Sequence, residues 1–315
     1  FVKVGAVGVC RSDLHVLEGL RDKDLVKYPL VPGHEWAGVI EGLGPGVESY
    51  KVGDKVICEG IIYCGKCKNC ESGKTNICLA GYEELGFTKQ GAYAEYIVVP
   101  QRFLHKLPAQ ASLVEAALME PLAVSCHAVR RSPLSAGDTI VVIGAGTIGL
   151  LAMMVASLKR PGKITVIERD ERKKELCLKL GATDFIAAKD AVVNINEGDI
   201  VFECSGAAPA LEMMFAWVRP GGTIVMLGAP AEGSKQGPHL GKMIGKDLRM
   251  EGIMGADHQA FTDAVEIFSQ GKLPLSELIA AKFALPDYEK AFATVNSGLI
   301  KPKVVLFPHE YQEGI

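Results

Sequence analysis

Four cysteines stand close together in one loop, at Cys64, Cys67, Cys70 and Cys78. Their spacing, C-x2-C-x2-C-x7-C, brings four thiolates within reach of one centre. Such a closed tetrahedral site suits a structural zinc ion, because no coordination position stays open for chemistry. An iron–sulfur cluster is the competing interpretation, since thiolates at two-residue intervals also suit it. The remaining cysteines without such grouping are interpreted as small buried side chains: Cys58, Cys126, Cys177 and Cys204.

A second chemical pattern lies further along the chain, in the stretch Thr139–Gly149. An apolar strand runs into a G-x-G-x-x-G turn with glycines at Gly144, Gly146 and Gly149, and a helical stretch follows. The glycines permit a tight turn, close approach of the backbone to a pyrophosphate, and close packing of the helix. The sequence therefore predicts a dinucleotide site, with a ligand-free tight turn as the plain alternative.

The cofactor is expected to be NAD, because Glu168 follows Gly149 by 19 residues, at the end of the next apolar strand. An acid there accepts hydrogen bonds from the adenosine ribose. Arg169 keeps NADP open, since an arginine beside the ribose can accommodate a 2′-phosphate. Further cofactor-binding candidates are Thr147, Ile148, Lys173, Cys204, Ser205, Gly206, Leu227 and Gly228.

Metal-binding residue types also occur near the start of the chain. Cys10 is followed by Ser12, Asp13 and His15, and His34 comes 24 residues after Cys10. Taken alone, a cysteine and a histidine on separate loops mean little, and a lone histidine is more often a satisfied polar residue. They indicate a metal site because the same chain also contains a four-cysteine loop and a dinucleotide turn.

Together these motifs make the chain similar, over essentially its whole length, to the medium-chain zinc-dependent alcohol and polyol dehydrogenases. The resemblance implies that Cys10 and His34 bind a catalytic zinc, which acts as a Lewis acid on an alcohol. It also implies a carboxylate as the third protein ligand. Glu120 stands where simple alcohol dehydrogenases have a cysteine, as is typical of the sorbitol- and glucose-dehydrogenase-like branch, and in some members Glu35 binds zinc instead. Which glutamate contacts the metal stays open at this point.

Other roles also follow from the resemblance. Asp13 is expected to support a zinc ligand, and Ser12 and His15 match the family's hydroxyl–imidazole proton relay. Either relay residue could instead be an ordinary turn residue. The strand ends at Cys204–Gly206 and Leu227–Ala229 are implied to cradle the nicotinamide, with ordinary turns as the alternative.

The substrate is expected to be a polyol, cyclitol or sugar, because a carboxylate in place of a thiolate makes the pocket more polar. The stretch Glu84–Ala92 is similar to that of dehydrogenases acting on inositol-like ketones. Phe87 and Thr88 are the resulting pocket candidates, although a plain strand-edge role is as reasonable. Rival activities are a threonine 3-dehydrogenase type and a simple secondary-alcohol dehydrogenase. A rival of another class is a non-catalytic zinc and dinucleotide sensor.

These sites need two kinds of element to position them. Up to about Pro108 the chain reads as short strands broken by glycine and proline, including Phe1–Val9 and Ala94–Val99. Beyond it, helices alternate with apolar strands such as Thr223–Leu227, as βαβ units require. The last part carries a helix, Ala260–Gln270, and a final strand, Lys303–Phe307.

The fold class expected is α/β: a GroES-like β-rich catalytic domain and a Rossmann domain with a doubly wound parallel sheet. We place the catalytic zinc domain at 1–122, the dinucleotide-binding domain at 123–256, and a segment returning to the catalytic domain at 257–315. Relatives carry further residues before the first residue and a helix in the 190–198 region. The N-terminal strands are therefore expected to be missing from this chain, and the short 190–198 region is a second departure.

Composition restricts the partners. With 48% hydrophobic and 23% charged residues, a net charge of −3 and no block of Lys and Arg, the chain is expected to bind neither nucleic acid nor membrane. Nine cysteines, an odd number, without a recognisable secretory signal suggest a reducing, cytoplasmic compartment. A homodimer or homotetramer is expected, formed through apolar edge strands such as Thr223–Leu227.

Overall fold

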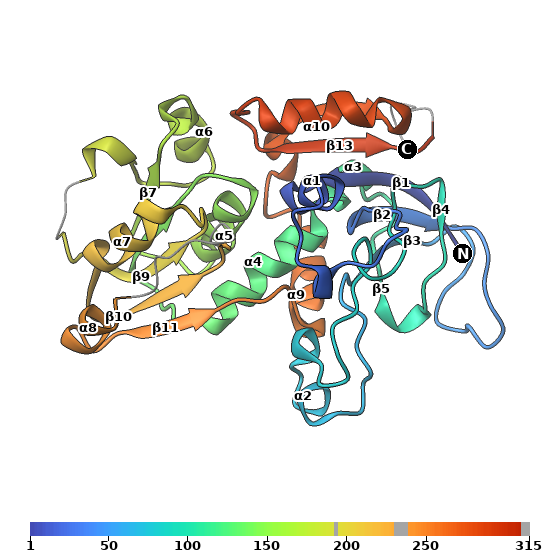
Figure 1. Cartoon of the computed structure of the whole chain (residues 1–315), viewed down its shortest axis with the longest axis horizontal. Coiled ribbons are helices and arrows are strands. Elements are labelled where there is room, and N and C mark those ends of the chain that lie inside the picture. The colour runs from blue at the N-terminus through green and yellow to red at the C-terminus, as the bar shows by residue number, and fades with distance from the viewer. Residues whose placement is uncertain (192–194, 230–238, 310–315) are drawn as a thin grey trace. The chain divides into compact units, whose positions relative to one another are not determined.

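The computed structural model describes residues 1–191, 195–229 and 239–309, which form two compact units (Figure 1). The first unit covers residues 1–123 and resumes at residue 255, and the second covers residues 124–254. Residues 192–194, within the short 190–198 region, lie outside the described part of the chain. No helix in the described ranges is long and apolar enough to cross a membrane.

The first unit is built on a seven-stranded sheet with the order β12-β13-β1-β2-β3-β5, and β4 also pairs with β1. Every pair is antiparallel except β12 with β13. The strands are β1 (Val2–Val9), β2 (Glu35–Ile40), β3 (Lys55–Cys58), β4 (Tyr96–Ile97), β5 (Leu104–Lys106), β12 (Ile279–Ala284) and β13 (Lys303–Phe307). The helices that begin in this unit are α1 (Arg11–Leu17), α2 (Lys68–Glu71), α3 (Leu113–Ala116), α4 (Met119–Arg131), α9 (His258–Ser269) and α10 (Tyr288–Asn296).

The second unit holds a six-stranded parallel sheet with the order β11-β10-β9-β6-β7-β8. Counted along the chain from β6, this is the 3-2-1-4-5-6 order of a Rossmann sheet. The strands are β6 (Thr139–Ile143), β7 (Lys163–Glu168), β8 (Asp184–Ala187), β9 (Gly198–Glu203), β10 (Val218–Met226) and β11 (Arg249–Gly252). The helices are α5 (Thr147–Ser157), α6 (Lys174–Lys179), α7 (Ala208–Trp217) and α8 (Leu240–Gly245). The predicted α/β fold, with a β-rich part and a Rossmann part, is confirmed.

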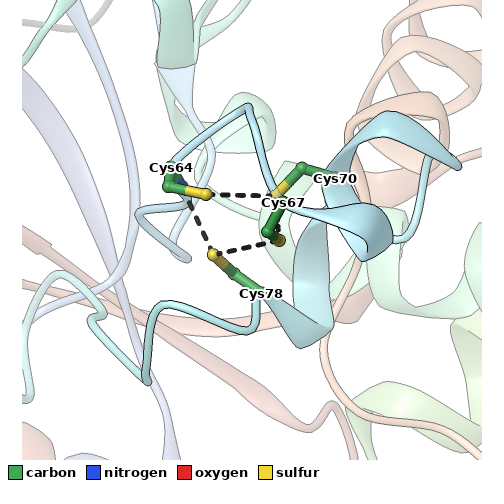
Figure 2. Close-up of side chains that lie close together, drawn as sticks. All are labelled: Cys64, Cys67, Cys70 and Cys78. Atoms are coloured by element: carbon green, nitrogen blue, oxygen red, sulfur yellow. Dashed lines mark hydrogen bonds between the residues drawn. The ribbon is translucent and has the colours of Figure 1, made fainter.

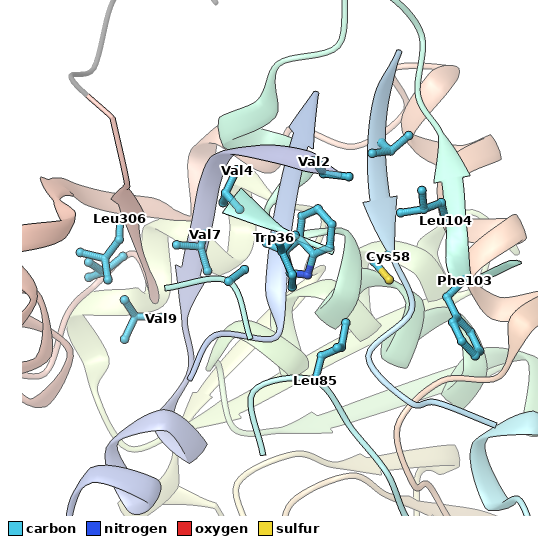
Figure 3. Close-up of a cluster of buried hydrophobic side chains, with 14 of the residues drawn as sticks. Val2, Val4, Val7, Val9, Trp36, Cys58, Leu85, Phe103, Leu104 and Leu306 are labelled. Atoms are coloured by element: carbon cyan, nitrogen blue, oxygen red, sulfur yellow. The ribbon is translucent and has the colours of Figure 1, made fainter. Parts of the chain in front are cut away.

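The hydrophobic core of the first unit lies against its sheet (Figure 3). Val2, Val4 and Val7 of β1 are buried with Trp36 of β2 and Leu306 of β13. Strand β13, close to the end of the chain, is the direct partner of β1, so the two ends of the described chain complete one sheet. Burial of these apolar side chains fixes the register of the strands that carry the candidate metal ligands.

The core of the second unit follows from its parallel strands. Strands β6, β9 and β10 contribute Val141, Val201 and Ile224, which are fully buried, and α7 packs against them with Phe215 and Trp217. Parallel strands covered on both faces read as continuous apolar runs, which explains why the sequence pattern located them well.

Four expectations from the sequence need correction. Strand β4 covers only Tyr96–Ile97 of the expected Ala94–Val99, and helix α9 starts two residues earlier than expected, where Asp257 caps its first turn through the N–H of Ala260. The run Thr223–Leu227 is not an edge strand, because β10 pairs with β9 on one side and β11 on the other. Its backbone groups are therefore already used and cannot join a second subunit.

The fourth correction concerns the ungrouped cysteines. Cys58, Cys126 and Cys177 are buried as expected, but Cys204 is only partly buried. It follows directly after β9, at the carboxyl end of the sheet.

Candidate functional site

The four cysteines of the loop converge on one point (Figure 2). Their Sγ atoms are 3.4 Å apart for Cys67 and Cys70, 3.9 Å for Cys67 and Cys78, and 4.0 Å for Cys64 and Cys70. Four sulfurs around a tetrahedral zinc, with bonds of about 2.3 Å, lie roughly 3.8 Å apart. The described geometry therefore fits zinc without rearrangement of the loop.

Backbone N–H groups also prepare this loop for thiolates. The N–H groups of Cys64 and Ala80 both point to Cys78 Sγ at 3.4 Å, and that of Leu79 points to Cys67 Sγ at 3.4 Å. Such N–H donors, with the one from Cys70 contributing most, lower the pKa of Cys67 to about 6. Burial and the neighbouring sulfurs raise the pKa of Cys70 to about 12. A divalent cation at the centre would offset this mutual repulsion of the sulfurs.

The second group of ligand atoms belongs to Cys10, His34 and Glu35, and all three atoms lie within 4.8 Å of one another. Cys10 follows β1 and precedes α1, while Glu35 is the first residue of β2. Strands β1 and β2 are antiparallel, and Gly8 stands opposite Glu35. A Cβ atom at Gly8 would lie 2.4 Å from Glu35 Oε2, so a larger residue there would displace this carboxylate.

Asp13 contacts two members of this group, Cys10 and His34. Its Oδ2 accepts hydrogen bonds from the N–H of Cys10 and from the hydroxyl of Tyr93, both at 2.9 Å. Its Oδ1 lies 3.3 Å from His34 Nδ1, an ion-pair distance without hydrogen-bond alignment. Burial raises the pKa of Asp13, but His34 and the hydrogen bonds outweigh burial and lower it. A carboxylate at Nδ1 leaves Nε2 as the nitrogen available to a metal, which is the usual support of a zinc-binding histidine.

A buried lysine, which the sequence analysis missed, faces the same group. Lys303, the first residue of β13, donates from Nζ to Glu35 Oε2 at 2.5 Å and lies 3.3 Å from the carbonyl of Val9. Burial lowers the pKa of Lys303, but the charges of Glu35, Cys10 and Asp13 together with the hydrogen bond to Glu35 outweigh burial and raise it. In the sequence this lysine is only the first residue of the expected strand Lys303–Phe307. The missed signal is that Lys303 opens a strand whose other four residues are all apolar.

Glu120 lies outside the group formed by Cys10, His34 and Glu35. It is the second residue of α4. Burial, with the carboxylates of Glu35 and Glu84, raises the pKa of Glu120 to about 8, although His34 acts in the opposite direction. A partly buried carboxyl with such a pKa can exist in the neutral form near neutral pH.

The two pocket candidates have different surroundings. The ring centroids of Phe87 and His34 lie 4.8 Å apart. The guanidinium carbon of Arg21 lies over the ring of Phe87, 3.7 Å from the centroid of that ring. Thr88 instead closes its own turn, because its hydroxyl accepts from the N–H of Glu84 at 2.8 Å. Phe87 is therefore placed beside the histidine, whereas Thr88 has a structural partner.

The relay candidates Ser12 and His15 lie on α1, three residues apart and so on one face of the helix. His15 is exposed and Ser12 is partly buried. In the described part of the chain no hydrogen bond joins their side chains.

In the second unit the glycine-rich turn has the geometry that its motif predicts. Gly144 adopts a φ of +98°, and Gly146 caps the start of α5. A Cβ atom at Gly149 would lie 1.9 Å from the carbonyl oxygen of Gly144. Only glycine therefore allows the helix to pack this closely on the turn.

The next strand end contacts this turn. Glu168 closes β7 and accepts from the N–H of Ala145 at 2.6 Å and from that of Asp170 at 2.9 Å. Lys173 donates to the carbonyl of Ala145 at 3.0 Å, and Arg169 is exposed. Two of the three cofactor candidates here, Glu168 and Lys173, thus contact the turn where a dinucleotide is expected.

A buried acid that the sequence analysis missed holds the two further strand ends. Glu203 is the last residue of β9, and its Oε1 accepts from the N–H groups of Ser205 at 2.8 Å and Gly206 at 3.0 Å. The carbonyl of Glu203 accepts from the N–H groups of Leu227 and Gly228. The expected Cys204–Gly206 and Leu227–Ala229 turns are therefore in contact.

Comparison with known proteins gives two matching family models. The alcohol dehydrogenase GroES-like domain matches residues 1–109, and the zinc-binding dehydrogenase model matches residues 147–270. The match to both models agrees with the division into a β-rich unit and a Rossmann unit.

Curated relatives match over most of their length. A 2-dehydro-3-deoxy-L-galactonate 5-dehydrogenase of Pseudoalteromonas atlantica is 36% identical over 302 residues, 93% of this chain and 86% of that protein. The D-xylulose reductase A of Aspergillus oryzae is 34% identical, over 94% of this chain and 86% of its own length. The L-threonine 3-dehydrogenase of Streptomyces coelicolor is 33% identical, over 94% and 88%.

Solved structures agree with this assignment. A zinc-binding dehydrogenase of Sinorhizobium meliloti bound to NADP has a TM-score of 0.89 and 27% identity, covering 98% of this chain and 91% of that one. A cobalt- and zinc-bound alcohol dehydrogenase of Pyrobaculum aerophilum has a TM-score of 0.87 and 27% identity, covering 98% and 90%. The chain therefore belongs to the zinc-dependent medium-chain alcohol and polyol dehydrogenase family and is an oxidoreductase that acts on alcohol groups.

Proposed function

We propose that the protein oxidises a secondary alcohol of a polyol, cyclitol or sugar, with NAD as the hydride acceptor. The observation that carries this proposal is the convergence of Cys10, His34 and Glu35, with a further, partly buried carboxyl at Glu120. Carboxylates favour a substrate rich in hydroxyl groups, since they accept hydrogen bonds that a thiolate accepts poorly. The relatives named for a deoxygalactonate and for xylulose support the same substrate class.

We further propose that Cys10, His34 and Glu35 bind the catalytic zinc and that Cys64, Cys67, Cys70 and Cys78 bind a structural zinc. When bound in the first set, zinc supplies Lewis-acid polarisation of a hydroxyl oxygen. Asp13 orients His34, and Lys303 balances the charge of Glu35. Glu120, rather than binding the metal, is assigned to hydrogen bonding with substrate or water. The choice of Glu35 over Glu120 rests on the distances among the ligand atoms.

The alcohol loses a hydride from carbon and a proton from its hydroxyl, and the proton needs a route to solvent. We assign this transfer to Ser12 and His15, which share one face of α1 with the imidazole on the solvent side. Histidine suits this role because its reference pKa lies near neutral pH.

The two units are proposed to divide these tasks. The zinc domain would cover 1–122, the dinucleotide domain 123–256, and the returning segment 257–315. The dinucleotide is assigned to the Gly144–Gly149 turn with Glu168, Arg169 and Lys173, and to the paired strand ends at Cys204–Gly206 and Leu227–Gly228. NADP is the alternative cofactor, because Arg169 is exposed beside Glu168 and because one structural neighbour was solved with NADP. A homodimer or homotetramer is proposed, without a role for the interior strand β10.

The test is the initial rate of NAD and NADP reduction with inositols, sorbitol, xylitol, threonine and 2-butanol, before and after zinc is removed and returned. Zinc-restored turnover on polyols or cyclitols is the expected result. Turnover restored only on 2-butanol would contradict the substrate class and leave the mechanism standing.

A pair of matched variants separates the two carboxylates. Glu35→Gln is expected to reduce zinc at the catalytic site, leaving one zinc per chain in the four-cysteine loop. Glu120→Gln is expected to retain both of these zinc ions and to raise KM for polyols. The reverse pattern would assign the metal to Glu120.

A threonine 3-dehydrogenase activity is the second candidate, favoured by the identity with the Streptomyces protein. It would require a cationic group for the substrate carboxylate. Arg21, which lies over Phe87 and 3.9 Å from Glu84, is a described candidate for this role. Zinc-restored turnover on threonine alone, abolished in Arg21→Gln, would favour this activity over the first.

A further inference from the structure

A third group of metal-binding side chains lies in the first unit and shares no residue with the two groups described above. Glu59 Oε1 lies 2.9 Å from His105 Nε2 and 2.6 Å from His258 Nδ1. One ligand atom from each of these three residues lies within 4.8 Å of the other two. Neither the proposed hydride transfer nor the four-cysteine loop uses any of them.

Three separate segments bring these side chains together. Glu59 directly follows β3, and His105 lies at the centre of β5, where it stands opposite Ile57 of β3. His258 is the first residue of α9, and its N–H donates to Thr75 Oγ1 at 2.9 Å. Sheet pairing and the start of a helix therefore hold all three positions.

The surroundings keep the imidazoles in place. Phe261, one turn after His258 on α9, stacks on the ring of His105 with centroids 5.7 Å apart. The rings of His105 and His258 are themselves 5.1 Å apart. The side chain of Glu59 is 2% exposed and that of His105 is 11% exposed, whereas that of His258 is 52% exposed. The group is thus a buried carboxylate and a mostly buried imidazole, with one imidazole open to solvent.

Two nitrogens and one carboxylate oxygen form the donor set of an open zinc site, in which water completes the coordination. Around a tetrahedral ion with bonds of about 2.0–2.1 Å, neighbouring ligand atoms lie roughly 3.3 Å apart. The described distances of 2.6 and 2.9 Å are hydrogen-bond distances, so the nitrogens must move outward by less than about 1 Å. The exposed side chain of His258 can make most of this adjustment.

We propose that Glu59, His105 and His258 bind a divalent transition-metal ion, zinc being the one that this ligand set suits best. The ion would join β3, β5 and the start of α9 and leave a coordination position facing solvent. Since the three residues are up to 199 positions apart in the chain, the ion would stabilise the folded state of the first unit.

The test is a calorimetric titration of the purified, zinc-containing protein with zinc chloride in a weakly coordinating buffer. We expect one further equivalent per chain for the unaltered protein and none, or binding at least tenfold weaker, for His258→Ala. Zinc should also raise Tm by several degrees in the unaltered protein but not in this variant. Because the side chain of His258 is half-exposed, its removal should leave the fold intact. Should His258→Ala fail to fold, His258→Asn serves in its place.

His239→Ala is the matched control. The side chain of His239 is 50% exposed and lies 3.9 Å from a carboxylate, that of Glu212, so it reproduces the exposure and local charge of His258 without a second histidine. This control should bind the further equivalent as the unaltered protein does. The proposal is overturned if the unaltered protein binds no further zinc, if His258→Ala still binds it, or if His239→Ala loses it. In these cases the three residues form only a hydrogen-bonded cluster.

Discussion

At the scale of single residues, the ammonium group of Lys303 has the clearest consequence. Its side chain is 2% exposed and that of its partner Glu35 is 3% exposed. Removing one member of a buried ion pair leaves the other charge uncompensated, which costs about 3–5 kcal/mol. We expect Lys303→Met to lower the free energy of unfolding by about this amount in zinc-depleted protein, as measured by urea denaturation.

The cause can be separated from simple loss of packing. In Lys303→Met combined with Glu35→Gln no charge is left unpaired, so most of the lost stability should return. Zinc should also reduce the loss in the single variant, because it supplies a positive charge beside Glu35. An equal loss in the single and double variants would show that the ion pair is not the cause. Lys272→Met, which alters an exposed lysine, should leave the stability unchanged.

At the scale of elements, the glycine-rich turn before α5 separates folding from cofactor binding. A Cβ atom at Gly146 meets nothing within 4 Å and its φ is −81°, whereas one at Gly149 would lie 1.9 Å from the carbonyl oxygen of Gly144. We expect Gly146→Ala to keep Tm within about 2 °C but to weaken NAD binding at least tenfold, since its methyl group occupies the approach of the pyrophosphate. We expect Gly149→Ala to lower Tm by several degrees, because the backbone at Gly144 or at the start of α5 must move to make room for the added methyl group.

Thermal denaturation and fluorescence titration with NADH measure the two effects. A Gly146→Ala variant with unchanged NADH affinity would place the pyrophosphate elsewhere. A Gly149→Ala variant with unchanged Tm would show that α5 can shift without cost.

A second prediction at this scale concerns Asp199, which ties together the starts of three strands of the parallel sheet. Its carboxylate accepts from the N–H of Thr139 at 2.8 Å and from Nε of Arg219 at 2.6 Å. Burial raises the pKa of Asp199, but these two donors outweigh burial and lower it. A pKa lower in the folded state than in the unfolded state stabilises the protein above the unfolded value, about 3.9, and this stabilisation disappears as the pH falls through the folded value.

We therefore expect Asp199→Asn to lower the free energy of unfolding by about 1–2 kcal/mol at pH 7. The difference from the unaltered protein should shrink between about pH 5 and pH 3 as the carboxylate is protonated. Urea denaturation across this range measures it, and Asp190→Asn, at an exposed position of the same unit, is the control. A difference independent of pH would exclude the charge of Asp199 as its source.

At the scale of the whole molecule, the two proposed zinc ions should differ in how easily they leave. Cys10, His34 and Glu35 provide three protein ligands and an open position, while the four-cysteine loop surrounds its ion completely. We expect dialysis against a chelator to remove one zinc ion first, with activity falling more than about tenfold at unchanged Tm. Return of zinc should restore the rate.

Zinc content, activity and Tm, all measured on the same samples, report the order in which the zinc ions leave. Longer chelation should then empty the cysteine loop and lower Tm. A Tm that falls in parallel with activity from the first sample onward would contradict independent sites. These outcomes refer to His258→Ala, which lacks the further site at Glu59. In the unaltered protein the ion of that site should also leave in the first step, and its loss should lower Tm by several degrees.

The sequence by itself determined the features that depend on neighbouring residues. The four-cysteine spacing, the glycine-rich turn and the apolar strands of the parallel sheet are local patterns, because each is formed by a short stretch of chain with its own geometry. The strand Lys303–Phe307 was placed at its observed bounds for the same reason. The resemblance carried by Cys10, His34 and Glu120 then indicated the family, and the comparisons confirm it.

The tertiary structure alone decided which distant residues meet. Lys303 contacts Glu35 across 268 positions, and His258 contacts Glu59 across 199, because strand pairing and helix packing bring the end of the chain back to the first sheet. The same holds for Glu35, which lies beside Cys10 through the pairing of β1 with β2, while Glu120 stays outside that group. Strand order also placed β10 inside its sheet. Periodicity records which face of a strand is buried, but it carries no information about which strand lies next to it.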